Sequence, residues 1–342
     1  MAQRTDFWAL ERENRGDTAR LVAVFIVLFA ALGFGFDFVA GNVRLTDAGG
    51  LAGFPILTIA ALIIATIQSI ASYYGGASLV LLSAHATALT PDTAKHQMVL
   101  DVVREMALAA KMPVPTAYII GDPSPNAFAT GRDPAHSVIC VTQGLVDDMD
   151  REEIQGVIGH EMAHVRDYDI RTMTMIAVLV GGVALLADFF YRWTWFGGGM
   201  SRRRSGDRDS GEAGLIIAIV VFILAALAPI FAQLLAMAVS REREYLADAA
   251  SVEFTRNPRA LLRALEHIAQ VEAPLAHASR GIAHLFIVNP LQAAGEDDEG
   301  YWANLLSTHP PLGRRIARLR AMAGEAPPAA VPPAAAGAAT SP

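Results

Sequence analysis

Four long apolar runs constrain this chain most strongly, because each is long enough to cross a membrane. A hydrocarbon core of roughly 30 Å needs about 20 helical residues at a rise of 1.5 Å per residue. Aromatic and arginine residues flank the runs, which is typical of segments that end at the membrane–water interface. The sequence predicts four transmembrane helices, and the alternative is four buried core helices. The runs cover residues 21–40, 51–74, 173–191 and 215–239.

The composition agrees with a membrane protein and excludes other classes. Of the 342 residues, 53% are hydrophobic and only 18% are charged, against about 25% charged in an ordinary soluble domain. The net charge of −7 gives no electrostatic footprint for a nucleic-acid partner. The single cysteine, Cys140, excludes an intrachain disulfide and a cysteine-rich metal site. Any metal must therefore be held by histidines and carboxylates.

The distribution of arginines predicts the orientation in the membrane. Lys and Arg collect in short cytoplasmic loops, and the first 20 residues hold four arginines, whereas the first connecting loop holds only Arg44. The N-terminus is therefore expected in the cytoplasm, together with residues 75–172 and 240–342. The loop 192–213 disagrees with this topology, because it carries five arginines yet would lie outside.

The segments outside the apolar runs predict a small mixed domain. Apolar residues at helical spacing predict a helix over Thr93–Lys111. Another helix is expected to begin near Asp150, which forms a capping-box pattern with Glu153. Between the two helices, β-branched and aromatic residues separated by turn residues predict three strands, at Thr116–Ile120, Ala127–Thr130 and Ser137–Thr142.

The sharpest motif is His160-Glu161-Met162-Ala163-His164, on the second of these helices. Histidines four positions apart share one face of a helix, one turn apart. Both imidazoles can therefore bind one tetrahedral zinc ion. Glu161 can take a proton from a water that the zinc activates. The alternative is a solvated helix with two unrelated histidines.

A third zinc ligand is expected from the helix that leaves the fourth apolar run. Glu244 follows that run within five residues and is expected to continue its helix. His164 precedes the third run by nine residues, about 14 Å along a helix expected to be continuous. Because a membrane hairpin joins these two runs, the helices must emerge side by side, with Glu244 opposite the two histidines. Asp248, one turn further on, can accept a hydrogen bond from a ligand imidazole. The alternative is a charged helix at the membrane edge, with ion pairs along one face.

Four segments resemble the HtpX family of membrane zinc endopeptidases, relatives of the CAAX prenyl protease. Their order and spacing match that family, and they span nearly all of residues 75–322. The chain has four apolar runs, as the HtpX plan does, whereas the prenyl proteases have more spans. The segments are Asn126–Gly131, His160–His164, Ser240–Asp248, and Ser307–Pro311 followed by Arg315.

The resemblance implies one zinc ion, bound by His160, His164 and Glu244, with Glu161 as the general base. It also implies that Asn126 borders the cleft and helps to hold the substrate, and that His309 and Arg315 lie near the zinc and the substrate carbonyl. Read from the residues alone, Asn126 and His309 are better explained as turn residues beside prolines. The strand that contains Ala127, Phe128 and Ala129 could accept an extended peptide by backbone hydrogen bonding.

Together these features predict a mainly α integral membrane protein, with four transmembrane helices and an α+β zincin-like catalytic domain that has a small β-sheet. The Ala/Pro tail cannot bury a core. The expected parts are a cytoplasmic segment 1–20, two membrane helices in 21–74, the first half of the catalytic domain at 75–172, a membrane hairpin 173–239 with its polar loop 192–213, the second half at 240–325, and a disordered tail 326–342.

The expected function is zinc-dependent cleavage of membrane or misfolded proteins at the cytoplasmic face of a bacterial inner membrane. The resemblance points to quality control under stress, with protein or peptide substrates and the lipid bilayer as partners, and leaves a homo-oligomer open. One alternative is a catalytically silent scaffold, in which a structural zinc would have four protein ligands and His309 could supply the fourth. Another alternative is processing of prenylated C-termini, which needs a larger intramembrane chamber.

Overall fold

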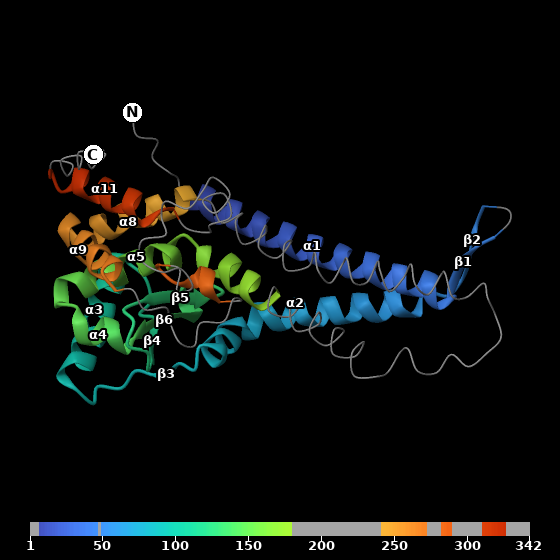
Figure 1. Cartoon of the computed structure of the whole chain (residues 1–342), viewed down its shortest axis with the longest axis horizontal. Coiled ribbons are helices and arrows are strands. Elements are labelled where there is room, and N and C mark those ends of the chain that lie inside the picture. Colours follow the sequence, from blue (N-terminus) through green and yellow to red (C-terminus); the bar gives the residue numbers. More distant parts are fainter. Residues whose placement is uncertain (1–6, 47–48, 180–240, 272–281, 289–309, 326–342) are drawn as a thin grey trace, which may run out of the picture.

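Two long helices project side by side from a mixed α/β unit in the computed structural model (Figure 1). The structure describes residues 7–46, 49–179, 241–271, 282–288 and 310–325. The long helices are α1 (Phe7–Ala40) and α2 (Ile56–Ser83). At their far end a short antiparallel hairpin, β1 (Val43–Leu45) with β2 (Leu51–Gly53), joins them.

Within the described ranges, α1 and α2 each contain a stretch that is long and apolar enough to cross a membrane. These stretches are Gly16–Gly35 and Ile56–Ser83, and only 29% and 17% of their most apolar windows are buried. Their remaining apolar side chains face away from the protein, which suits lipid. The described residues therefore contain two of the four predicted spans. Of the third run only residues 173–179 are described, and the fourth lies outside the described residues.

The prediction for residues 51–74 is wrong at both ends of that run. Residues 51–53 form β2, and the helix starts at Ile56, where Asp37 Oδ1 accepts a hydrogen bond from the Leu57 amide at 3.0 Å. The helix also continues past the predicted end at residue 74, through Gly75 and Gly76, as far as Ser83. A Cβ built at Gly76 would lie 2.8 Å from Thr174 Cγ2. This glycine therefore serves close helix packing and does not end the helix.

A four-stranded sheet forms the base of the α/β unit, and its strand order is β3-β4-β6-β5. Strands β4 and β6 are parallel and the other pairs are antiparallel. The three strands predicted from the sequence are confirmed, with one extra residue at the end of β5. The strands are β3 (Thr87–Ala88), β4 (Thr116–Ile120), β5 (Ala127–Gly131) and β6 (Ser137–Thr142).

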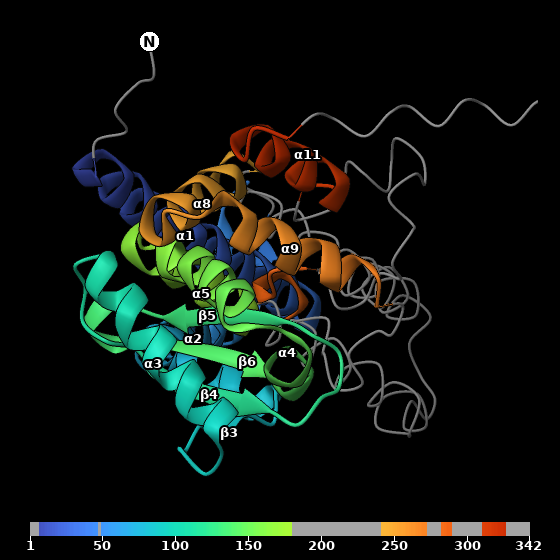
Figure 2. The same ribbon diagram turned by 90° about the vertical axis from the view of Figure 1, so that its left-hand side faces the viewer.

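Helix α5 (Arg151–Arg166) lies between this sheet and a layer of helices (Figure 2). It packs against β5 on one side and against α8 and α9 on the other. The predicted capping box of Asp150 and Glu153 begins it. The other helical segments are α3 (Ala94–Ala109), η1 (Pro134–His136), α4 (Gln143–Asp148), α8 (Arg241–Thr255), α9 (Pro258–Ala269), η2 (Ala283–Leu285) and α11 (Leu312–Met322).

Helix α5 does not run straight into the third apolar run, contrary to the expectation from the sequence. It ends at Arg166, with Asp167 as its C-cap, and Tyr168 adopts a left-handed backbone conformation with φ 62°. The chain becomes helical again over residues 169–179, where the described segment ends. This break turns the Asp169 side chain back toward His164, at 3.1 Å.

Candidate metal centre

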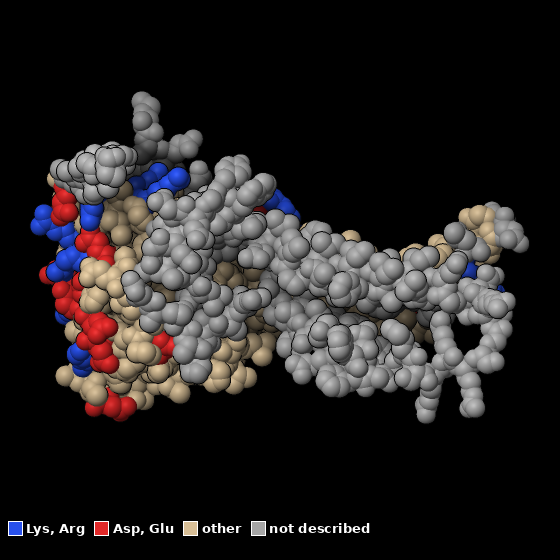
Figure 3. Space-filling model, in the orientation of Figure 1, with Lys and Arg blue, Asp and Glu red and all other residues tan. Residues whose placement is uncertain are grey.

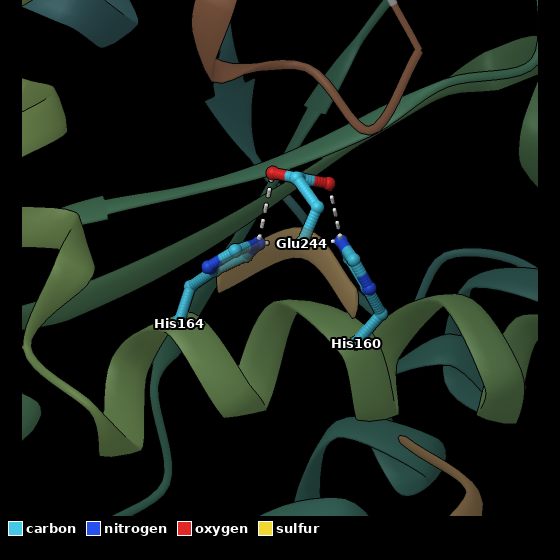
Figure 4. Close-up of side chains that lie close together, drawn as sticks. All are labelled: His160, His164 and Glu244. Carbon is cyan, nitrogen blue, oxygen red and sulfur yellow. Dashed lines mark hydrogen bonds and ion pairs between the residues drawn. The ribbon is translucent and has the colours of Figure 1, made fainter. Parts of the chain in front are cut away.

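His160 and His164 lie one turn apart on α5 and point to the same side of the helix (Figure 4). Both side chains are almost completely buried, beneath α8 on the one side and the sheet on the other. Their Nε2 atoms lie 3.2 Å apart. Two imidazole nitrogens are therefore directed at one point in the interior.

Glu244 on α8 brings a carboxylate to the same point from the opposite side. Its Oε2 lies 3.6 Å from His160 Nε2, and its Oε1 lies 3.6 Å from His164 Nε2. The three possible ligand atoms lie within 4.8 Å of one another. Ligands of a tetrahedral zinc, at bond lengths of about 2.0–2.1 Å, lie about 3.3 Å apart. Two imidazoles and one carboxylate at these separations fit a zinc ion that keeps one position for water or substrate.

Each histidine holds a carboxylate with its other ring nitrogen. His160 Nδ1 lies 3.0 Å from Asp248 Oδ1, and His164 Nδ1 lies 3.1 Å from Asp169 Oδ2. When Nδ1 carries the proton and donates it to a carboxylate, the lone pair of Nε2 is left for a metal. Both imidazoles are thus oriented in the way that metal-binding histidines usually are.

Arg315 on α11 closes the side of the centre next to His160. Its buried guanidinium donates two hydrogen bonds to Asp248, from Nε at 3.1 Å and from Nη2 at 2.7 Å. Its Nη1 lies 3.4 Å from Glu244 Oε2 and donates to the Ile287 carbonyl at 2.7 Å. One cation therefore balances two buried carboxylates, which would otherwise be costly to keep charged.

Burial and the neighbouring charges set different pKa values for the two histidines. Burial, together with the Arg315 guanidinium, lowers the pKa of His160 to about 4. Burial also opposes the charged form of His164, but the hydrogen bond to Asp169 and the charge of Glu244 outweigh it and raise the pKa to about 9. At neutral pH the metal-free centre therefore holds one neutral imidazole and one imidazolium.

Glu161 follows His160 on α5, and its side chain faces β5. The backbone amide of Ala129 donates a hydrogen bond to its carboxylate, and burial raises the pKa of Glu161 to about 7. Its Oε1 is buried and, within the described part of the chain, makes no hydrogen bond. A buried carboxylate with such a pKa can accept and return a proton near neutral pH.

The outer edge of β5, where the sequence predicts substrate pairing, is covered by the chain itself. The Ile287 amide donates to the Ala127 carbonyl at 2.9 Å, and Phe286 forms an antiparallel bridge with Phe128. Asn126, predicted to hold the substrate, donates from its side chain to the Val288 carbonyl at 2.9 Å. In this structure Asn126 thus holds the segment 286–288 against β5.

The structure therefore brings together six of the predicted site residues: His160, Glu161, His164, Glu244, Asp248 and Arg315. The predicted substrate residues Asn126, Ala127 and Phe128 contact the segment 286–288 instead. His309 lies outside the described residues.

Asp169 was not predicted from the sequence, because residues five positions apart on an unbroken helix do not lie on the same face. Arg243, which contacts Asp169 Oδ1 at 3.1 Å, and Asn14 on α1 were not predicted either. The run of polar residues before the first apolar run was the only sequence signal for Asn14. No local pattern connects Asn14 with Asp169, which lies 155 positions further along the chain.

The sequence of this chain is similar to those of known proteins. Residues 93–323 match peptidase family M48. The protease HtpX homologue of Lactobacillus acidophilus is 40% identical over 311 residues, which are 90% of this chain and 97% of that protein. The homologue of Caldanaerobacter subterraneus subsp. tengcongensis is 38% identical over 322 residues, covering 94% and 99% of the two chains.

A solved structure, the crystal structure of S. mikatae Ste24p, is also similar. It matches 92% of this chain and 66% of its own, with 19% sequence identity and a TM-score of 0.45. The two HtpX homologues and the M48 match extend over the segments that carry His160, His164 and Glu244. The chain therefore belongs to the M48 family of peptidases, as a relative of the HtpX proteases.

Proposed function

We propose that this protein is a membrane-anchored, zinc-dependent endopeptidase that cleaves membrane or misfolded proteins at the cytoplasmic face. One observation carries the proposal: the ligand atoms of His160, His164 and Glu244 converge within 4.8 Å in a buried centre, beside the Glu161 carboxylate. Three protein ligands are the number that catalytic zinc sites use, because the fourth position is left for water or substrate.

The surrounding residues suit hydrolysis of a peptide bond. Zinc bound by this donor set would supply a Lewis acid that activates water and polarises a carbonyl. Glu161 takes the proton of the attacking water and passes it to the leaving amine. Asp248 and Asp169 hold the two imidazoles in the ligand orientation, and Arg315 stabilises the buried carboxylates next to them.

The position of the centre supports substrates that lie at a membrane. Helices α1 and α2 carry the α/β unit at one end and the β1–β2 hairpin at the other (Figure 1). Most of the visible acidic and basic side chains gather at the α/β end (Figure 3). The arginine distribution favours the cytoplasm for this end. Tails, loops and misfolded segments of membrane proteins would reach the centre there, which agrees with a stress-related role in the bacterial inner membrane.

A substrate that pairs with β5 has to take the place of the segment 286–288. Extended peptides add to a sheet through the free backbone groups of an edge strand. The Ala127 carbonyl is one such group, and the Ile287 amide now occupies it. Arg315 donates hydrogen bonds both to the Ile287 carbonyl and to Asp248. Displacement of the segment 286–288 would therefore change the contacts of Arg315 with Asp248 and, through Asp248, the environment of His160.

Cleavage of a fluorogenic peptide library by the purified full-length protein in detergent tests the function. We expect cleavage to stop on removal of metal by a chelator and to return with one equivalent of zinc per chain. A protein that binds zinc but cleaves no peptide or unfolded protein would be the silent scaffold instead. Cleavage that continues at the same rate after complete metal removal would overturn the zinc mechanism.

A further inference from the structure

The amino-terminal helix reaches the metal centre, although it lies outside the residues that match the peptidase family. Asn14 is buried on α1, two residues before the apolar stretch Gly16–Gly35 begins. Its side chain donates to Asp169 Oδ1 at 2.9 Å and to the Asp167 carbonyl at 2.5 Å. These two acceptors belong to the break between α5 and the next helical segment, so α1 fixes the conformation of that break.

The contact continues from Asp169 to the metal centre. Asp169 uses Oδ1 for Asn14 and Oδ2 for His164 Nδ1, so one carboxylate joins α1 to an imidazole whose Nε2 faces Glu244. Because the carboxylate is buried and has hydrogen-bond partners on both oxygens, its rotation is restricted. Such partners of a ligand histidine typically change metal affinity by 10–100-fold when they are lost.

The other ligand-bearing helix is tied to α1 as well. Arg243, the residue before Glu244, donates to the Asn14 side-chain oxygen and to Asp17 Oδ2, the latter at 2.7 Å. It also contacts Asp169 Oδ1 at 3.1 Å. The segment that follows α5 and helix α8 thus meet α1 at one polar cluster, formed by Asn14, Asp17, Asp169 and Arg243.

We propose that Asn14 is a positioning residue of the metal centre, which holds Asp169 so that the His164 imidazole faces Glu244. The inference rests on the proposed zinc binding at His160, His164 and Glu244. Its consequence is that the first membrane helix is a part of the site as well as an anchor. A catalytic domain released from α1 would therefore bind zinc more weakly even if it folded.

Zinc affinity of the full-length protein in detergent, measured by competition with a chromophoric chelator, tests this. We expect Asn14→Ala and the similarly sized Asn14→Leu to weaken zinc binding roughly tenfold. Thr18→Val is the matched control, because Thr18 lies one turn away on α1 and its buried hydroxyl bonds Thr172 and the backbone carbonyl of Asn14, but neither the Asn14 side chain nor Asp169. The control should bind zinc within about twofold of the parent.

Two further measurements separate positioning from general stability. The visible spectrum of the cobalt-substituted protein should change in Asn14→Leu and not in Thr18→Val, because it reports ligand geometry. In an Asp169→Asn background, Asn14→Leu should weaken binding no further, since both residues act through one contact. Parent-like zinc affinity in both Asn14 variants, or fully additive losses with Asp169→Asn, would overturn the inference. A parent protein that binds no zinc would instead overturn the proposed function.

Discussion

At the scale of single residues, the metal centre depends on the groups that lie behind its two histidines. His160 and His164 present the same nitrogen to the centre, but one is backed by Asp248 with Arg315 and the other by Asp169. The guanidinium beside His160 favours the neutral imidazole, whereas no such cation faces His164 directly among its described contacts. Two chemically equal ligands therefore differ in their proton affinity.

This difference predicts how zinc binding depends on pH. The pKa of His164 is raised to about 9, so at pH 7 zinc must displace a proton from Nε2. The apparent association constant should rise by up to about tenfold between pH 7 and pH 8, and should level off above pH 9, where the proton is already lost. Titration calorimetry in buffers of different ionisation enthalpy measures the released proton. Zinc binding without proton release at pH 7 would contradict the assigned state of His164.

Loss of the buried cation should destabilise the metal-free protein strongly. Arg315→Leu leaves Asp248 and Glu244 without their guanidinium, and breaking a buried pair from one side costs about 3–5 kcal/mol. Arg314→Ala is the control, because Arg314 is exposed on the same helix and should change stability by less than about 0.5 kcal/mol. Denaturant unfolding in detergent compares the two. Equal stability of Arg315→Leu and the parent would show that the Asp248 and Glu244 charges are balanced elsewhere.

At the scale of elements, much of the fold could be predicted from local patterns, and the misses came from distant contacts. Strands β4 to β6, α3 and the capped start of α5 follow from short-range periodicity and turn chemistry. The break after Arg166 could not be predicted, because Asp167 and Tyr168 are not typical helix-ending residues and the conformation is held by Asn14, far away in the sequence.

In the candidate site, too, the residues in local patterns could be predicted, whereas contacts between distant segments could not. His160, Glu161 and His164 are readable from one helical turn, and Glu244 follows from the reasoning that the two helices emerge together. The segment 286–288 on β5 was not predicted, since nothing in its own sequence indicates which edge it covers. The end of the second apolar run at residue 74 was mispredicted for a related reason, because Gly76 allows the close approach of Thr174 to α2.

Alanine substitutions at two helical glycines should have opposite effects on stability, because one glycine lies where α5 packs closely on α9 and the other lies in open space. A Cβ at Gly156 would lie 2.4 Å from the Leu261 backbone nitrogen, whereas a Cβ at Gly313 on α11 would meet nothing within 4 Å. Gly156→Ala should therefore lose about 1–3 kcal/mol or more through overpacking. Gly313→Ala should leave stability unchanged or raise it by up to about 1 kcal/mol, as expected in a helix. Thermal unfolding ranks both against the parent, and a stabilised Gly156→Ala would contradict the close contact.

At the scale of the whole molecule, the two apolar helices hold the β1–β2 hairpin and the peptidase unit at opposite ends (Figure 1). In a membrane these ends would face different compartments. The cluster of Asn14, Asp17, Asp169 and Arg243 then lies where α1 enters the bilayer, between lipid and metal centre. Membrane anchoring and the proposed metal binding would then depend on the same helix, α1.

The arrangement predicts the accessibility of two introduced cysteines. Arg44→Cys on the hairpin should react with a membrane-impermeant maleimide in sealed right-side-out vesicles, and Arg104→Cys on α3 should react only after the vesicles are opened. Both positions are exposed, and the native Cys140 is buried, so the background should be low. Burial also raises the pKa of the Cys140 thiol. Labelling in the opposite order would reverse the orientation proposed from the arginines.

Glu161 is proposed to transfer the proton beside a zinc ion that His160, His164 and Glu244 would bind. The most direct measurement determines zinc content and peptide cleavage together for Glu161→Gln, with Glu152→Gln, on the exposed side of the same helix, as the matched control. We predict one zinc per chain in both variants, parent-like cleavage in the control, and a loss of at least about 100-fold in Glu161→Gln. Cleavage by Glu161→Gln at the parent rate, with zinc bound, would contradict this role of Glu161.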